Sequence, residues 1–97
     1  MRERDIERYL VKRVKELGGE VRKVKWLGRA HAPDRVVMLP EEEWDKWSVP
    51  REAIWVELKA PGEKLRPGQL REHERMRRMG QRVVVIDSIE GVEELLR

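Results

Sequence analysis

The spacing of apolar residues changes along the chain, and each change marks an expected element. In the first part, the apolar positions recur at the spacing of one helix face: Ile6, Leu10, Val14 and Leu17. They predict a helix from about residue 3 to residue 17, which is ended by the glycines that follow. A final helix is expected at the other end of the chain, where Ser88 can cap its first turn.

Between these helices, short stretches rich in β-branched residues predict strands at residues 20–27, 34–39, 53–59 and 82–86. A helix that begins near Pro67 and ends at Gly80 separates the last two strands. The element order is therefore αβββαβα. Neighbouring strands followed by a helical crossover indicate an α/β fold, with a mixed sheet flanked by helices.

Length and composition restrict the class of protein. The chain has 97 residues, which suits a single domain over residues 1–97. Its net charge of +3 permits a polyanionic partner without requiring one. It contains no cysteine, which excludes disulfides, thiolate metal sites and a thiol nucleophile. Its charged N-terminus and its lack of a long apolar run predict a cytoplasmic protein without a membrane span.

The strand at residues 53–59 carries an unusual pair of charges. Since side chains alternate between the faces of a strand, Ile54, Val56 and Leu58 are expected in the core. Glu57 and Lys59 then share the other face, about 7 Å apart. An exposed charge pair would explain this arrangement, and so would a catalytic one.

Asp34 offers a second carboxylate near the same place. Pro33 favours an extended conformation before it, so Asp34 stands where the strand 34–39 begins. If that strand pairs with the strand 53–59, Asp34 and Glu57 converge, and Mg²⁺ is commonly held by one or two such carboxylates. The alternative is that Asp34 simply ends a loop.

Two polar residues lie beside the apolar stripes of their helices. Glu7 falls within about 20° of Val14 around the first helix, and Gln69 has the same relation to Met76 on the second. Each is expected to have a polar partner. Alternatively, Glu7 belongs to a first-turn charge pattern that the helix dipole favours, and Gln69 is a first-turn residue that faces water.

Together these residues carry a resemblance. "APD", followed by "VELKAPGEKLRPGQ", resembles the PD-(D/E)XK nuclease superfamily and, more narrowly, the VRR-NUC (virus-type replication-repair nuclease) family. The similarity extends from Glu7 to the strand "RVVVI", and the chain resembles small stand-alone phage members. It implies a restriction-endonuclease-like core of order αβββαβ. One departure is the segment "GRAHAPD", which is longer between glycine and "PD" than the compact form of the motif.

The resemblance also implies roles for single residues. Asp34 and Glu57 match the metal-binding acids, with the Leu58 carbonyl as a further ligand for Mg²⁺ or Mn²⁺. Lys59 matches the catalytic lysine, as a base or as an electrostatic stabiliser. Glu7 matches the first-helix acid, which would act through water or a second metal, and Gln69 matches the helix glutamine that positions water or the lysine.

The implied activity is metal-dependent hydrolysis of DNA, on branched DNA such as four-way (Holliday) junctions. Stand-alone viral relatives are homodimers, and such a protein would work in the cytoplasm of a host cell without an organic cofactor. A non-catalytic subunit that binds DNA or another protein is the alternative. Eight basic residues are candidates for phosphate contacts: Arg13, Arg22, Lys23, Lys25, Arg29, Lys64, Arg66 and Arg71.

The remaining distinctive residues are histidines and tryptophans. His31 lies in the loop before "PD", where it is either recruited to the site or an ordinary loop residue. His73 is expected to pack in the core, since it lies beside Met76 on the helix. Trp44 and Trp47 are three residues apart between two prolines. They would form either a small cluster under the loop or the anchor of a two-fold interface.

Overall fold

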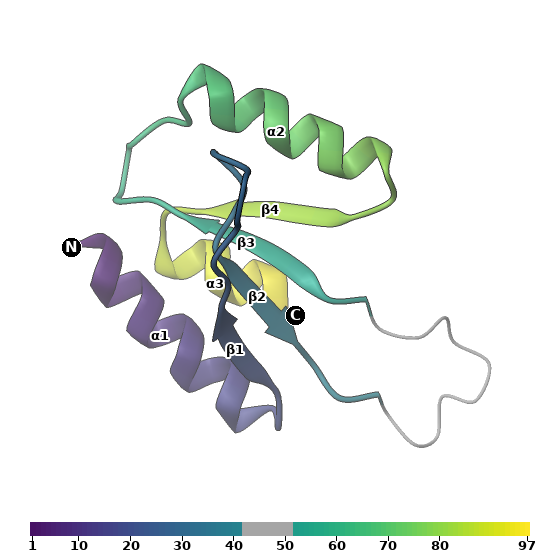
Figure 1. Ribbon diagram of the computed structural model, residues 1–97. Coiled ribbons are helices and arrows are strands. Elements are labelled where there is room, and N and C mark those ends of the chain that lie inside the picture. Colours follow the sequence, from purple (N-terminus) through teal and green to yellow (C-terminus); the bar gives the residue numbers. More distant parts are fainter. Residues whose placement is uncertain (42–51) are drawn as a thin grey trace.

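The centre of the protein is a mixed sheet of strand order β1-β2-β3-β4 (Figure 1). The computed structural model describes residues 1–41 and 52–97. The strands are β1 (Glu20–Lys23), β2 (Arg35–Met38), β3 (Ile54–Leu58) and β4 (Arg82–Ile86), and the helices are α1 (Glu3–Glu16), α2 (Pro67–Arg78) and α3 (Ile89–Leu96). β1, β2 and β3 are antiparallel neighbours, and β4 is parallel to β3. The predicted fold class is confirmed.

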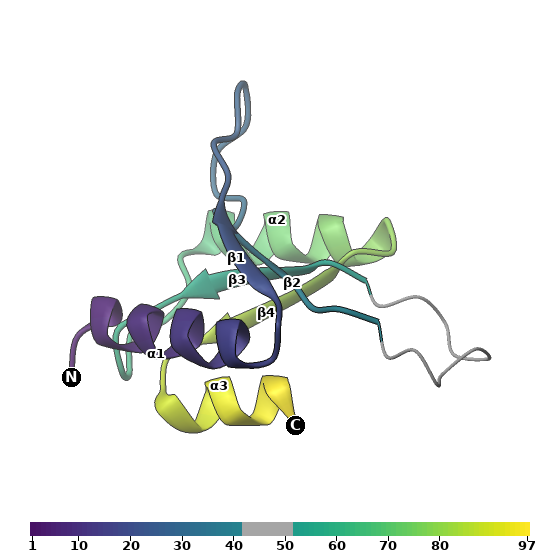
Figure 2. The ribbon, with the colours of Figure 1, turned by 90° about the horizontal axis from the view of Figure 1, so that it is seen from below.

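The two faces of the sheet are covered by different helices. Figure 2 shows α1 and α3 on one side and α2 on the other. The hydrophobic core lies on the α1 and α3 side, where Ile54, Val56 and Leu58 are buried against Leu10 and its helical neighbours. The alternation predicted for β3 is therefore confirmed. The opposite residues of β3, Trp55 and Glu57, face α2.

The first strand is shorter than the sequence suggested. The prediction of a strand over 20–27 is wrong beyond Lys23, although Val24 still donates from its N–H to the carbonyl of Asp34 at 2.9 Å. Two contacts hold Trp26 outside the sheet. Its ring packs against Trp55, with 5.2 Å between ring centroids and a tilt of 46° between the planes, and its indole N–H donates to the Pro33 carbonyl at 2.9 Å. Residues 24–34 form a loop that projects on the α2 side (Figure 2).

The helix boundaries agree with the sequence to within about two residues. α1 ends at Glu16 and α2 at Arg78, slightly before the predicted positions. The predicted cap of the last helix is confirmed, because the Ser88 hydroxyl accepts from the Gly91 N–H at 2.9 Å. No helix among residues 1–41 and 52–97 is long and apolar enough to cross a membrane.

The burial of α1 predicts that substitutions at two adjacent residues change the free energy of unfolding by very different amounts. Leu10 is fully buried and Val11 is 42% exposed. Leu10→Ala should therefore lower the free energy of unfolding by about 2–5 kcal/mol, because it removes transfer energy and leaves a cavity. Val11→Ala should change it by less than about 0.5 kcal/mol. Urea unfolding followed by circular dichroism measures both, and equal losses would contradict this assignment of the core.

Candidate active site

Two carboxylates meet where β2 and β3 lie side by side. β2 and β3 pair with Arg35 opposite Val56. Asp34 directly precedes β2, and the same register continued by one residue brings it opposite Glu57, whose pKa the Asp34 carboxylate raises. Cross-strand neighbours have Cβ atoms about 5 Å apart on the same face. Asp34 is 62% exposed, whereas the Glu57 side chain is only 13% exposed. The predicted convergence of the two acids therefore follows from the strand register.

The surroundings of Glu57 favour its protonated form. Burial raises the pKa of Glu57 to about 7; the Lys59 ammonium opposes this rise, and the Asp34 and Glu3 carboxylates add to it. Carboxylates gathered in this way repel one another unless a cation lies between them. Sequence reasoning did not single out Glu3, because only the fold brings the beginning of α1 towards β3.

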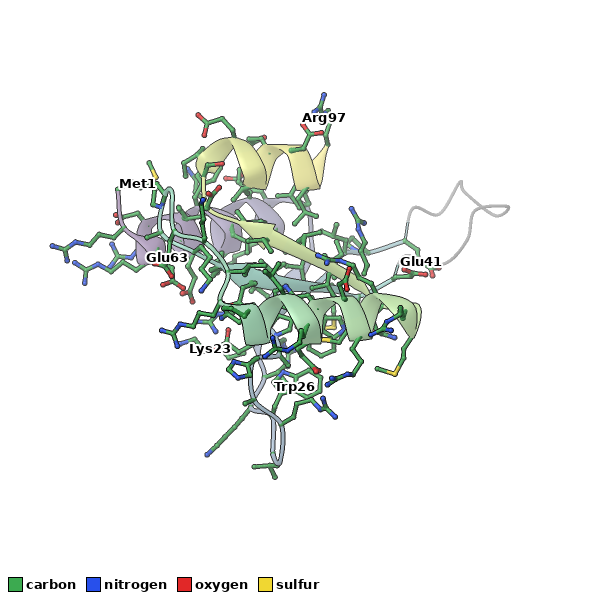
Figure 3. All side chains as sticks on the ribbon, turned by 90° about the horizontal axis from the view of Figure 1, so that it is seen from above. Met1, Lys23, Trp26, Glu41, Glu63 and Arg97 are labelled. Carbon is green, nitrogen blue, oxygen red and sulfur yellow. The ribbon has the colours of Figure 1, made fainter. Side chains whose placement is uncertain are left out.

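The Lys59 side chain is more buried than a residue on an exposed strand face would be. Its side chain is 7% exposed, and its ammonium lies 3.3 Å from a carboxylate oxygen of Glu63. Its backbone N–H donates to the Ile86 carbonyl at 2.9 Å, which extends the pairing of β3 with β4. Glu63, labelled in Figure 3, lies at the same end of the molecule as Met1, opposite Glu41.

The "APGE" sequence explains how Glu63 reaches Lys59. The Glu63 N–H donates to the Ala60 carbonyl at 2.9 Å, and Gly62 has a φ of 79°. With Pro61 before it, Gly62 occupies the third position of a type II turn, where a left-handed conformation is required. This tight turn reverses the chain after β3 and returns Glu63 to the lysine.

Glu7 has the polar partner that its position on α1 requires. Its carboxylate accepts hydrogen bonds from Nε and Nη2 of Arg35, each at 3.2 Å. Nη1 of the same guanidinium lies 2.9 Å from Oδ1 of Asp34. Arg35 therefore connects the first-helix acid to a candidate metal ligand. The sequence analysis missed Arg35, although its alternation with Asp34 places it on the α1 face of the sheet.

α2 carries Gln69, which the sequence predicted as a site residue, and His73, which it did not. Oε1 of Gln69 accepts from the Arg66 N–H at 3.0 Å and so caps the helix, and its role beside the lysine stays a prediction. His73 is fully buried, as expected, but its Nε2 lies 3.2 Å from Oε1 of Glu57. Sequence reasoning treated His73 as packing and missed this contact.

The projecting loop is fixed against α2 by two contacts. Nη1 of Arg29 donates to the buried carboxylate of Glu72 at 2.7 Å. His31 has a φ of 71°, and its ring lies against Gly68, where an added Cβ would come within 2.8 Å of that ring. His31 therefore packs on the beginning of α2. Gly68 supplies the space for this close approach.

A basic hollow of about 330 Å³ lies between this loop and α2. Arg29, Arg71 and Arg75 line it. Arg13, one of the candidate phosphate contacts, lies away from this hollow. It is paired with Glu16 and Glu93 on the α1 and α3 side of the sheet. The other candidates are exposed, although Arg22 is paired with Glu20.

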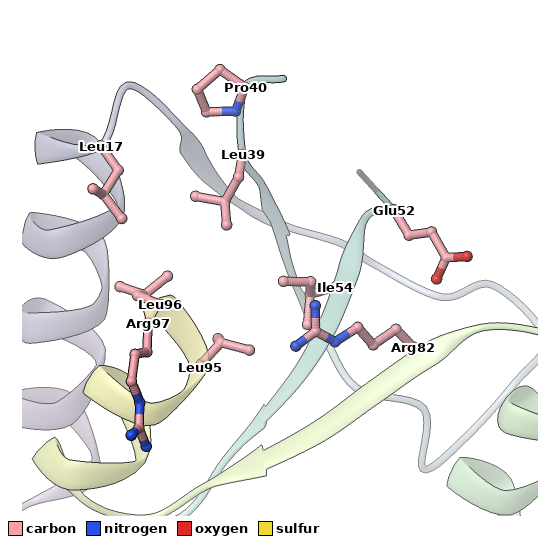
Figure 4. Close-up of a pocket in the computed structure, with 9 residues that line it drawn as sticks. All are labelled: Leu17, Leu39, Pro40, Glu52, Ile54, Arg82, Leu95, Leu96 and Arg97. Carbon is pink, nitrogen blue, oxygen red and sulfur yellow. The ribbon is translucent and has the colours of Figure 1, made fainter. Parts of the chain in front are cut away.

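A larger hollow of about 530 Å³ lies at the opposite end of the sheet (Figure 4). It is lined mainly by apolar side chains, including Leu39, Ile54 and Leu95, and it borders Arg82 and Glu52. Ile54 begins β3, whereas Glu57 and Lys59 lie at the other end of that strand. This hollow therefore belongs to a region apart from the carboxylates.

The donor set fits a hard cation with few protein ligands. Within the described ranges, no three acidic or histidine side chains are grouped closely enough to hold a metal by themselves. Asp34, Glu57 and the Leu58 carbonyl would hold Mg²⁺ with water and substrate phosphate completing its coordination, as is common for this ion.

Comparison with known proteins gives the family. No family model matches the chain. "Putative nuclease p44" of Acyrthosiphon pisum secondary endosymbiont phage 1 is 44% identical over 88 residues, which are 91% of this chain and 85% of that protein. A solved structure described as "VRR_NUC domain" aligns with a TM-score of 0.79 and 38% identity, and the alignment covers 97% of this chain and 92% of that one. The chain belongs to the VRR-NUC family.

Membership in the VRR-NUC family confirms the resemblance found in the sequence, and the fold is that of a nuclease domain. The longer segment before "PD" lies in the projecting loop, where Arg29 and His31 contact α2. Trp44 and Trp47 lie outside the described residues, so their interpretation stays a prediction.

The raised pKa of Glu57 predicts how the metal-free VRR-NUC domain responds to pH. The fold binds a proton at Glu57 more tightly than the unfolded chain does, since the pKa is about 7 in the fold against an ordinary value of 4.5. This contribution to stability is present below pH 4.5 and lost as the pH rises through 7. Glu57→Gln should therefore stabilise the metal-free protein by roughly 1–3 kcal/mol at pH 8.

Urea unfolding in the presence of a chelator measures this gain, and the gain should shrink towards zero near pH 4.5. Glu74→Gln is the matched control, because Glu74 is an exposed acid of α2. A gain that stays constant with pH would mean that the ionisation of Glu57 does not cause it.

Proposed function

We propose that this protein is a metal-dependent endonuclease that hydrolyses phosphodiester bonds in DNA, with branched DNA such as the four-way junction as its substrate. The observation that carries the proposal is the placement of Asp34 opposite Glu57, with Lys59 two residues further along the chain, directly after β3. The same order of residues led to the family resemblance, and the nuclease-named phage relative supports the reaction class.

Mg²⁺ or Mn²⁺ is the proposed cofactor. Asp34, Glu57 and the Leu58 carbonyl hold it in this proposal. When bound, the cation supplies an activated water and stabilises charge on the phosphate and the leaving oxygen. Glu7 is held by Arg35 and so acts on the site through that guanidinium, which also contacts Asp34.

Lys59 acts as an electrostatic stabiliser in this mechanism. Its ammonium is enclosed and paired with Glu63, so it is fixed beside the place where phosphate charge develops. A preorganised charge of this kind needs no reorientation during the reaction. Gln69 donates from its amide nitrogen to the attacking water, since its oxygen caps α2.

DNA binds on the α2 side of the sheet in this proposal. The projecting loop and α2 present Arg29, Arg71 and Arg75 around the basic hollow, and α2 also carries His73, which contacts Glu57. Such phosphate contacts set position and orientation without reading sequence. They suit an enzyme that recognises the shape of a branched substrate.

A homodimer completes the proposal, because paired incision of a four-way junction needs two sites at a fixed separation. Sedimentation equilibrium of the purified protein tests the oligomeric state. A monomer at all concentrations that support cleavage would remove the dimer from the proposal.

The first test of function is cleavage by Lys59→Met. Because the Lys59 side chain is buried, methionine keeps its volume while removing the charge. The variant should fold and bind Mn²⁺ like the wild type, and it should cleave about 100-fold to 1000-fold more slowly. Four-way, splayed-arm and linear DNA are incubated with Mg²⁺, with Mn²⁺ and with chelator. Lack of cleavage of every substrate by the wild type would favour a non-catalytic binding protein.

The DNA-binding surface is tested by salt dependence. Arg71→Gln should weaken binding to every DNA structure and reduce the slope of log K against log salt by about 1, as expected for one lost phosphate contact. Arg82→Gln is the control, because Arg82 lies at the far end of the sheet beside the apolar hollow. Fluorescence anisotropy in chelator measures both variants. Equal slopes for Arg71→Gln and the wild type would mean that bound DNA does not contact Arg71, and would contradict a binding surface on α2.

A further inference from the structure

His73 is a fully buried polar residue on the face of α2 that covers the sheet. Its Nε2 lies 3.2 Å from Oε1 of Glu57, and its Nδ1 is buried without a hydrogen-bond partner among the described residues. An unpaired polar atom in the interior costs free energy. Met76 lies on the same buried face, so this face accepts apolar side chains. Stability alone therefore gives no reason for a histidine here.

The contact with Glu57 supplies that reason. A glutamate side chain has three rotatable bonds, and a metal-binding carboxylate must be held in one of its many orientations. Neighbouring groups that hydrogen-bond to a ligand commonly fix it in this way. We propose that His73 is a positioning residue, which donates its Nε2–H to Oε1 of Glu57 and leaves Oε2 of that carboxylate for the cation. This role rests on the metal-dependent function proposed above.

The direction of the hydrogen bond follows from the surroundings of the imidazole. Nε2 faces Oε1 of Glu57, whereas Nδ1 is buried without a hydrogen-bond partner among the described residues. A carboxylate that binds a cation is ionised, so it can only accept. If Nδ1 carried the ring hydrogen, a donor would be buried without a partner and two lone pairs would face each other at the ionised Glu57. With the hydrogen on Nε2, the contact with an ionised carboxylate is attractive and only an acceptor remains unpaired.

The test compares substitutions that differ in where they place an N–H group. His73→Gln can present its amide nitrogen near the former Nε2, whereas the shorter side chain of His73→Asn presents it near Nδ1. His73→Leu fills similar space without a donor. Isothermal titration of each protein with Mn²⁺ alone, at one pH and without DNA, gives the metal affinity. Urea unfolding gives the stability of the same samples.

The expected result is a split between the variants. His73→Asn and His73→Leu should bind Mn²⁺ about 10-fold to 100-fold more weakly, as is usual when the partner of a metal ligand is lost. His73→Gln should stay within about threefold of the wild type, which a purely structural role would not predict. In a Glu57→Gln background, His73→Asn should weaken Mn²⁺ binding no further, because the two residues act as one unit.

Two outcomes would overturn the positioning role. One is equal Mn²⁺ affinity for His73→Asn and the wild type, and the other is equal weakening by His73→Asn and His73→Gln. If His73→Leu fails to fold, the comparison of His73→Asn with His73→Gln still tests the positioning role. A wild type that binds and cleaves with Mn²⁺ while its affinity is insensitive to His73 would refute only this inference. A wild type that binds no Mn²⁺ would refute it together with the metal-dependent function.

Discussion

Side chains alternate between the faces of a sheet, so the register between β2 and β3 determines which groups meet on each side. In this register Asp34 stands opposite Glu57 on the α2 face, while Val37 stands opposite Ile54 in the core. A slip of one residue would send the carboxylate into the core and the valine towards α2. Burial of the apolar residues therefore enforces the geometry of the polar ones. The site depends on the core for its alignment, although the two lie on opposite faces.

That alignment creates an electrostatic conflict in the metal-free protein. Glu57 is enclosed near the Asp34 and Glu3 carboxylates, and its pKa rises to about 7. Two basic residues offset part of the conflict: Arg35 joins Glu7 to Asp34, and Lys59 is held by Glu63 close to Glu57. This arrangement suits a site that gains most from a divalent ion.

Much of the fold could be predicted because each element follows a local rule. The apolar spacing of α1, the alternation of β3 and the Ser88 cap were all visible in the sequence. The end of β1 was not, because the contact of Trp26 with Trp55 joins segments distant in the sequence. The same limit applies to the site. Asp34, Glu57 and Lys59 form a recognisable motif, whereas the roles of Arg35 and His73 depend on which helix lies over which strand.

The two faces of the sheet differ in the kind of residue that they bury. On the α1 and α3 face the described contacts are mainly apolar, and buried residues such as Leu10 contribute through packing. On the α2 face, by contrast, the buried residues include His73 and Glu72, each bonded to a polar group from another segment. Buried polar groups specify geometry at the expense of stability. α2 therefore holds two other segments in place. Glu72 binds the projecting loop through Arg29, and His73, the next residue, contacts Glu57. A single helix thereby sets the position of the proposed DNA-binding loop relative to Glu57, the proposed metal-binding carboxylate.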